Sequence, residues 1–220
     1  MKFKLTRLIR DIESLQRHIE ARGFVTYANL YSLRIGDEFV VNFCFVADGW
    51  PLRLVASHKL NEKVSLLSFY RVRHFWHELA RTKKCLLIGH SPSELANINE
   101  WILKSGYPQF ETLVDGFREL EELETIIKNL NHDGIDIIFL ALSQPKQEQL
   151  MEKLSHLEGK VSIVACGAHW LQEAGMSIAP SHFLSNIGIY GLVRSWRSPR
   201  RLYLGTVGAL MPLIRNLLRD

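Results

Sequence analysis

Cysteine and long hydrophobic runs are both scarce in this sequence of 220 residues. Its three cysteines, Cys44, Cys85 and Cys166, are far apart, and each lies in an apolar run. Their spacing fits neither a disulfide framework nor a metal site, so we expect reduced core thiols in a cytoplasmic protein. No stretch reaches the roughly 18 consecutive apolar residues of a membrane-spanning helix. The basic N-terminus is followed by no apolar segment, so a secretory signal is not expected.

Common ligand-binding motifs are also absent. The sequence contains no P-loop and no Gly-x-Gly-x-x-Gly fingerprint, so a standard nucleoside-triphosphate or dinucleotide site is not supported. It contains no His-Glu-x-x-His or Cys-x-x-Cys motif either, so we predict no metal site and no cofactor. A recognised nucleic-acid-binding motif and an interleaved aromatic platform are missing as well, and we expect no nucleic acid as a partner.

The composition is that of a globular protein. Apolar residues make up 47% of the chain and charged residues 23%, which excludes a disordered chain. The length suits one large domain, or one domain with an appendage, and is too short for two full α/β enzyme domains.

Positive charge is concentrated near the C-terminal end. Residues 190–220 contain six arginines, no lysine and one acidic residue, whereas the net charge of the whole chain is only +4. Basic residues confined to one end predict an element that binds a charged surface, such as phospholipid or nucleic acid. Apolar residues lie between these arginines, which suits a helix lying in a membrane interface. A helix that packs on the domain with solvated arginines explains the pattern equally well.

Short apolar runs alternate with helical segments along the chain. We expect strands at residues 24–27, 39–47, 52–56, 84–88, 112–114, 135–142 and 161–165, and helices at residues 3–22, 66–82, from 91 onward, 118–130 and 146–154. This alternation predicts a Rossmann-like α/β fold, in which helices flank a mostly parallel sheet. Only helical segments follow Gly167. We therefore predict an α/β domain over residues 1–179 and a basic helical appendage over residues 180–220.

In open α/β sheets, ligands bind beyond the carboxyl ends of the strands, and this rule selects a few acidic residues. Asp48 and Asp115 each follow an expected strand, and Gly49 leaves room beside the first of them. Asp-Gly is also the strongest short turn signal, so a hairpin leading to a strand at 52–56 is the more frequent explanation. The functional alternative makes the Asp48 carboxylate a general base at the rim of a pocket.

The junction at residues 143–148 also allows two explanations. Pro145 suits a first helical turn, and Glu148 is an acid that the helix dipole favours, so an ordinary helix start is the more common case. In the functional alternative, free backbone N–H groups, Lys146 and the amide of Gln147 face a phosphate.

Histidines and tryptophans receive no functional role from the sequence. His90 and His169 stand at strand ends, where a lone histidine is more often a surface or hydrogen-bonded residue than a catalyst. Core or pocket lining, rather than a sugar platform, is expected for Trp50, Trp76, Trp101 and Trp170.

Five short stretches are more informative together than singly. They are Val25-Thr26-Tyr27-Ala28-Asn29, Ala47-Asp48-Gly49, Gln144-Pro145-Lys146-Gln147-Glu148, Cys166-Gly167-Ala168 with Ala174-Gly175 and Ala179-Pro180, and Ser198-Pro199-Arg200-Arg201-Leu202 after Arg194. In this order they resemble the motifs of the WecG/TagA/CpsF family of glycosyltransferases, over roughly residue 26 to the C-terminus. The Pro-Lys-Gln-Glu stretch is the most specific of them.

The chain departs from the family pattern at residues 62–68. The family has Glu-Arg-Val-Thr-Gly-x-Asp where this chain has Glu62-Lys63-Val64-Ser65-Leu66-Leu67-Ser68. Lys63 keeps the charge of the arginine but not its bidentate fork, and Leu66 fills the space of a glycine. Ser143-Gln144 before the Pro-Lys-Gln-Glu motif and Tyr190-Gly191 in place of a Glu-Trp pair also differ. The resemblance therefore points to a divergent member and leaves the donor sugar open.

The resemblance implies an enzyme that moves an N-acetylhexosamine-type sugar, such as N-acetylmannosamine, with inversion. The donor is a UDP-sugar and the acceptor a polyprenyl-diphosphate-linked sugar, in the synthesis of a cell-surface polysaccharide. The protein would lie in the cytoplasm, peripheral on the inner face of the plasma membrane, with an anionic membrane surface as a partner. Its oligomeric state stays open, a homo-oligomer included. The alternative is a non-catalytic sugar-nucleotide-binding or scaffold member of the family.

The family motifs also imply roles for individual residues. Asp48 would take the proton from the acceptor hydroxyl. Gln147, Lys63 and the helix start at Pro145 and Lys146 would steady the donor diphosphate as UDP leaves. The remaining substrate-binding candidates are Thr26, Asn29, Gly89, Glu148, Gly167, Arg194, Arg200 and Arg201. The three arginines of the tail would hold the acceptor diphosphate or lipid headgroups.

Overall fold

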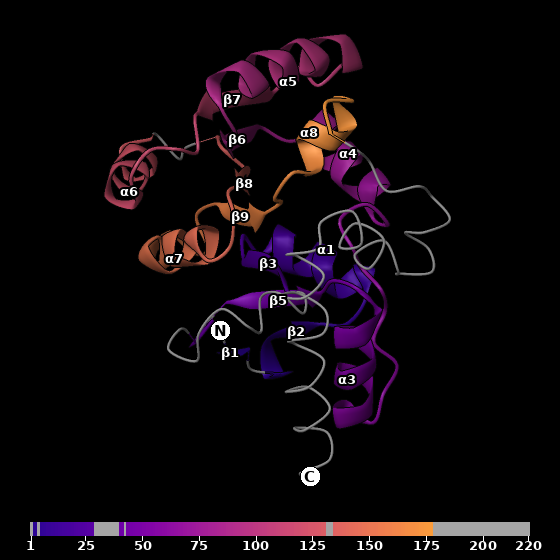
Figure 1. Cartoon of the computed structure of the whole chain (residues 1–220). Helices are drawn as coiled ribbons and strands as arrows, with labels where there is room; N and C mark the ends of the chain where they lie inside the picture. Colours follow the sequence, from indigo (N-terminus) through magenta and orange to yellow (C-terminus); the bar gives the residue numbers. More distant parts are fainter. Residues whose placement is uncertain (1, 4, 29–39, 42, 131–133, 178–220) are drawn as a thin grey trace, which may run out of the picture.

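The structure is a computed structural model that describes residues 2–3, 5–28, 40–41, 43–130 and 134–177 (Figure 1). At its centre is a seven-stranded sheet in which all neighbouring strands run parallel. In spatial order the strands are β2 (Leu8–Ile9), β5 (Cys44–Ala47), β3 (Phe24–Ala28), β9 (Ser162–Ala165), β8 (Ile137–Ala141), β6 (Cys85–Gly89) and β7 (Phe110–Val114). A second sheet pairs β1 (Lys2–Phe3) with β4 (Val40–Val41). The predicted Rossmann-like α/β fold is confirmed.

Helices cover both faces of the large sheet (Figure 1). The helices of the described residues are η1 (Leu5–Arg7), α1 (Ile12–Glu20), α3 (Trp50–Leu60), α4 (Arg73–Thr82), α5 (Pro92–Ser105), α6 (Leu120–Lys128), α7 (Lys146–Lys153), η2 (Ser155–Leu157) and α8 (His169–Glu173). Apolar side chains of α1, α4, α5 and α8 form one core cluster with the sheet. Those of α6 and α7 form a second cluster on the opposite face. Crossover helices that join parallel strands produce this layering.

Successive side chains along each strand point to opposite faces of the sheet, so one strand contributes residues to both core clusters. In β6, Leu87 packs against the face that carries α5, whereas Leu86 and Ile88 pack toward α6 and α7. All residues of β3, β6, β8 and β9 are buried. Burial on both faces explains why these strands read as continuous apolar runs in the sequence. Thr26 in β3 and Ser162 in β9 are the polar residues that share this burial.

The sequence signals for helix ends are accurate at α5. The Ser91 side chain accepts a hydrogen bond from the backbone N–H of Glu94, and the Glu94 carboxylate accepts one from the backbone N–H of Ser91. Pro92 stands in the first turn, and Gly106 ends the helix in the left-handed region at φ 73°. These caps satisfy backbone groups at both ends, so the helix is well defined by local sequence.

Two helix predictions extend too far toward the N-terminus. The helix expected at 3–22 is confined to α1, because Leu8–Ile9 pair with β5 as an edge strand. The helix expected at 66–82 begins only at Arg73. The apolar residues before it are buried in an irregular segment, and their spacing imitates a helical period.

The strand expected at 52–56 is also wrong, since these residues lie inside α3. Gly49 at φ 90° ends the extended backbone of β5, and Pro51 stands in the first turn of the helix. Proline is preorganised for that position. The chain therefore leaves β5 through a strand-to-helix turn.

The connections reverse direction between β6 and β8. From β6 the chain passes to β7 on one side, and from β8 it passes to β9 on the other. In open α/β sheets, ligands commonly bind at such a switch point, beyond the carboxyl ends of the two strands. The segments that follow β6 and β8 begin at His90 and Leu142.

Three further sequence predictions concern the cysteines, membrane-spanning helices and the C-terminal appendage. Cys44, Cys85 and Cys166 are free thiols, as predicted, and the latter two are buried. No helix in the described part of the chain is long and apolar enough to cross a membrane. The predicted boundary near residue 180 and the basic appendage over 180–220 lie outside the described residues.

Candidate active site

Asp48 stands directly after β5, at the carboxyl edge of the sheet. Its backbone N–H donates to the carbonyl oxygen of Ala28 at the end of β3, over 2.6 Å. Gly49 then turns the chain into α3. The hairpin explanation of the Asp-Gly pair is therefore wrong, and the carboxylate occupies the edge where parallel α/β sheets bind ligands.

Burial raises the pKa of the Asp48 carboxyl to about 6. Desolvation disfavours the charged form of a carboxylate, and it is the cause of this shift. A carboxylate with a pKa near the working pH is a suitable general base, because it is ionised yet basic enough to accept a proton.

Glu148 on α7 is the centre of a buried hydrogen-bond network. Its Oε1 accepts from Thr26 Oγ1 at 2.7 Å, from Gln147 Nε2 at 2.8 Å and from Gln144 Nε2 at 2.9 Å. The same Gln144 amide donates to the carbonyl oxygen of Tyr27 at 3.2 Å. The network ties the start of α7 to β3, so the Thr26 and Pro-Lys-Gln-Glu motifs meet although they are far apart in sequence.

Two oxygens of this network have no hydrogen-bond partner among the described residues. They are Oε2 of Glu148 and Oε1 of Gln147, and both side chains are buried. Burial raises the pKa of Glu148, while the hydrogen bonds from Gln147, Thr26 and Gln144 oppose that rise. Through these three hydrogen bonds, Glu148 holds the side chains of Thr26, Gln144 and Gln147 in position.

Lys146 makes a different contact from the one expected. Its Nζ donates to the carbonyl oxygen of Gly116 at 2.9 Å and to that of Arg118. The ammonium group thereby ties the start of α7 to the loop after β7. Pro145 precedes α7 at its N-cap position, following a cis Gln144–Pro145 peptide bond.

Gly89 and Gly167 differ in the space around them. A Cβ atom on Gly89 would lie 2.4 Å from the carbonyl oxygen of Ala141, so β6 approaches β8 closely at the switch point. A Cβ atom on Gly167 would meet nothing within 4 Å. The carboxyl end of β9 is therefore open, whereas that of β6 is tightly packed.

We predict that Gly89→Ala destabilises the protein by about 3 kcal/mol or more, because a forbidden contact adds to the cost of φ +136°. Gly159→Ala is the matched control, since Gly159 has φ +84° and no atom near its Cβ position. Its cost should stay at about 1–2 kcal/mol. Urea unfolding of both variants separates packing from backbone strain, and equal losses would contradict the close-packed assignment.

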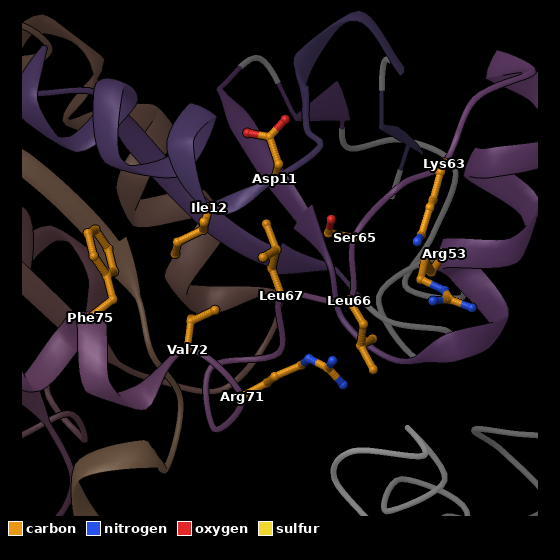
Figure 2. A pocket seen from close by; sticks show the side chains of 10 residues that line it. All are labelled: Asp11, Ile12, Arg53, Lys63, Ser65, Leu66, Leu67, Arg71, Val72 and Phe75. Carbon is orange, nitrogen blue, oxygen red and sulfur yellow. The ribbon is translucent and has the colours of Figure 1, made fainter.

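A cavity of about 730 Å³ adjoins this edge of the sheet (Figure 2). Its lining residues are Asp11, Ile12, Arg53, Lys63, Ser65, Leu66, Leu67, Arg71, Val72 and Phe75. The backbone N–H of Ser65 donates to the carbonyl oxygen of Arg10 at 2.8 Å, which places the cavity at the carboxyl end of β2. Leu66, where the family pattern has glycine, forms part of its wall.

Positive charge dominates the cavity. Figure 2 shows the Lys63 amino group and the Arg53 guanidinium on the same side of it, and Arg71 contributes a third cation. The acidic residue of the lining, Asp11, caps α1 by accepting from the backbone N–H of Ser14 at 2.7 Å. Arg53 Nε is buried and has no hydrogen-bond partner among the described residues. An anionic ligand would satisfy such a donor set.

The comparison with protein families decides the identity. The model of the glycosyl transferase WecG/TagA/CpsF family matches residues 3–220. The chain belongs to the WecG/TagA/CpsF glycosyltransferase family. A comparison with curated proteins found no match.

Membership in the WecG/TagA/CpsF family makes the chain a glycosyltransferase of cell-surface polysaccharide synthesis. A transferase of this family requires a sugar donor and an acceptor. The match therefore includes the C-terminal residues for which the sequence predicts a basic appendage. The resemblance inferred from the five sequence stretches is thus confirmed.

The structure brings together only part of the predicted site of this WecG/TagA/CpsF member. Thr26, Gln147 and Glu148 meet in one network, and Lys63 lies in the cavity. The predicted residues that lie outside the described part are Asn29, Arg194, Arg200 and Arg201. Asp48 is linked to the cavity by the first turn of α3, where the backbone N–H of Arg53 donates to the carbonyl oxygen of Gly49 at 3.3 Å.

Sequence reasoning missed Arg53 as a site residue. No motif marks it, and its only signal is a position one helical turn after the Asp48-Gly49 pair. That signal depends on a helix where the sequence predicted a strand. The error in secondary structure therefore hid the residue, because only in a helix does the backbone N–H of Arg53 reach the carbonyl oxygen of Gly49, four positions earlier.

Proposed function

We propose that the protein transfers an N-acetylhexosamine-type sugar, such as N-acetylmannosamine, from a UDP donor to a polyprenyl-diphosphate-linked sugar. The observation that carries this proposal is the position of Asp48. Its carboxyl, with a pKa raised to about 6, stands at a strand end one helical turn from Arg53 of the cationic cavity. A base beside an anion-binding cavity is what a transfer with a diphosphate leaving group requires.

The proposed reaction is a single in-line displacement with inversion. Asp48 takes the proton of the acceptor hydroxyl, whose oxygen forms the new bond to the anomeric carbon of the donor. The bond from that carbon to the UDP oxygen breaks, and UDP leaves with the electron pair. Carbon and phosphorus keep their oxidation states, so the step needs no redox cofactor.

The cationic cavity is proposed to stabilise the UDP leaving group. Lys63 and Arg53 place two positive charges on one side of it, and Leu66, Leu67 and Phe75 supply an apolar wall. Developing charge on the diphosphate is stabilised best by donors that are already oriented before reaction. The Glu148 network, which joins Gln147 and Thr26, orders the neighbouring strand end.

We predict that Lys63→Met weakens UDP binding by about 10- to 100-fold, the loss expected for one charge-assisted contact. Arg53→Met should have an effect of the same size. The matched control is Lys83→Met, since Lys83 is exposed after α4 and far from the lining residues. Calorimetric titration with UDP over a salt series gives the constants, and unchanged binding in both cavity variants would remove UDP from this cavity.

The transfer itself is tested by a donor screen. Full-length protein is incubated with a short-chain polyprenyl-diphosphate sugar and a panel of UDP-sugars, and UDP release is measured. We expect release with an N-acetylhexosamine donor that depends on the acceptor. Failure of every donor, with UDP binding retained, would support the alternative of a non-catalytic sugar-nucleotide-binding or scaffold member.

The protein is proposed to act in the cytoplasm, peripheral on the inner face of the plasma membrane. The support is the chemistry of residues 190–220, where six arginines lie among apolar residues. Arg194, Arg200 and Arg201 would contact the acceptor diphosphate or anionic lipid headgroups. Each arginine near an anionic bilayer gains on the order of 1 kcal/mol, and salt screens that gain.

A further inference from the structure

Three side chains outside the candidate active site converge between α4 and α8. His77 comes from α4, and His169 and Glu173 are one turn apart on α8. The ligand atoms of the three residues all lie within 4.8 Å of one another. His77 Nε2 is 3.1 Å from Glu173 Oε2, and His169 Nε2 is 4.0 Å from Glu173 Oε1.

His169 is a buried polar side chain whose ring makes no hydrogen bond to the described residues. The residue is only 3% exposed, and neither ring nitrogen has a hydrogen bond within the described residues. A buried polar group left in this state costs about 1–3 kcal/mol. Histidine binds a metal through a ring nitrogen that carries a lone pair, and such an ion would satisfy the buried ring of His169.

His77 is held with one nitrogen directed at the cluster. Its Nδ1 contacts the hydroxyl of Tyr107, which leaves Nε2 toward Glu173. Metal-binding histidines are regularly fixed in this manner, with the second ring nitrogen donating to a neighbouring oxygen. The ring of Tyr107 also stacks near that of His77, with centroids 5.8 Å apart.

We propose that His77, His169 and Glu173 bind a divalent transition-metal ion of the zinc class. Two imidazoles and one carboxylate form a donor set that zinc favours. Zinc bonds of about 2.0–2.2 Å place neighbouring ligand atoms roughly 3.3 Å apart. The 3.1 Å pair already meets this spacing, whereas His169, whose Nε2 is 4.0 Å from Glu173 Oε1 in a set that spans up to 4.8 Å, must move inward when the ion binds.

Bound metal would connect two parts of the chain that no local motif joins. Ninety-six positions separate His77 from Glu173, so no short sequence motif marks this site. The ion would fix α8 against α4, and with it the turn at Gly167 that precedes α8. Its role is therefore proposed as structural, and the transfer reaction does not depend on it.

Metal titration of full-length protein, after treatment with a chelator, tests the proposal. We expect one Zn²⁺ per chain by calorimetry, a rise in melting temperature, and a visible ligand-field spectrum with Co²⁺. Glu173→Gln keeps the size of the side chain but removes the charge, and should weaken Zn²⁺ binding by at least about 100-fold. Tyr107→Phe should weaken it by about 10- to 100-fold, as loss of an orienting partner does.

His74→Ala is the matched control, since His74 lies exposed on the same helix and outside the cluster. It should keep both the stoichiometry and the affinity. Circular dichroism establishes that Glu173→Gln is folded. Zn²⁺ binding that survives in the folded Glu173→Gln and His77→Ala variants would overturn the proposal, as would a full-length chain that binds no Zn²⁺ or Co²⁺ at micromolar concentration.

Discussion

Asp48→Asn should lower the rate of sugar transfer by about 10²- to 10⁴-fold, the usual contribution of a general base. The amide has nearly the same shape as the carboxylate but cannot take the proton from the acceptor. UDP binding should stay within about twofold of the original, because the cationic cavity is untouched. Steady-state assays of UDP release and calorimetry with UDP measure the two effects separately. Near-normal turnover would show that Asp48 only shapes the turn into α3.

The same substitution should stabilise the folded protein at neutral pH. Burial raises the pKa of Asp48 from 3.8 to about 6, so the carboxyl contributes a penalty that grows as pH rises from the unfolded toward the folded value. At pH 7 the penalty reaches up to about 3 kcal/mol. Asp48→Asn removes it, so the melting temperature should rise at pH 7 and change little near pH 4. This gain in stability follows from burial of the carboxyl alone, so the transfer assay, and not the melting temperature, separates a general base from a turn residue.

The transfer rate should follow the ionisation of Asp48. With a pKa of about 6, the base is active above that pH and loses activity as the solution becomes more acidic. The profile of kcat/KM should therefore rise through about pH 6 and then level. The residual activity of Asp48→Asn should lack this step, which assigns the step to the carboxylate.

Glu148→Ala should destabilise the protein by about 3–5 kcal/mol, among the largest losses from one side chain. It removes the acceptor of three hydrogen bonds and leaves the buried donors of Thr26 and Gln147 without that acceptor, while the Gln144 amide keeps its bond to the carbonyl oxygen of Tyr27. Truncation also leaves a cavity, which adds to the loss. Donor binding should weaken as well, because β3 and α7 lose their connection. Urea unfolding and UDP titration of the folded fraction measure these effects.

Two variants make the Glu148 experiment specific. Glu148→Gln retains a carbonyl oxygen in place of Oε1 and should lose less than half as much stability. Gln149→Ala changes the exposed neighbour on α7 and should stay within about 0.5 kcal/mol of the original. If Glu148→Ala lost no more stability than the control Gln149→Ala, the three hydrogen bonds would contribute no net stability.

The strands of this protein were predictable where the sheet buries both faces. β3, β6, β8 and β9 are continuous apolar runs, and no other short element buries so many consecutive residues. The α5 helix was equally predictable, since Ser91, Glu94 and Gly106 are local signals that act within one turn. Errors occurred where partners far along the chain decide the conformation. Leu8–Ile9 form a strand only because β5 lies beside them.

The sequence by itself determined the fold class, the WecG/TagA/CpsF resemblance and the candidate residues at strand ends, because these depend on short-range patterns. The tertiary structure alone decided what each residue contacts. It joined Thr26 to Glu148 across 122 positions, directed Lys146 to backbone carbonyls and placed Arg53 beside Lys63. It also brought His77 to His169 and Glu173. Side-chain contacts and burial, which determine the pKa of Asp48, arise only when the strands lie side by side, and no local pattern encodes that distance.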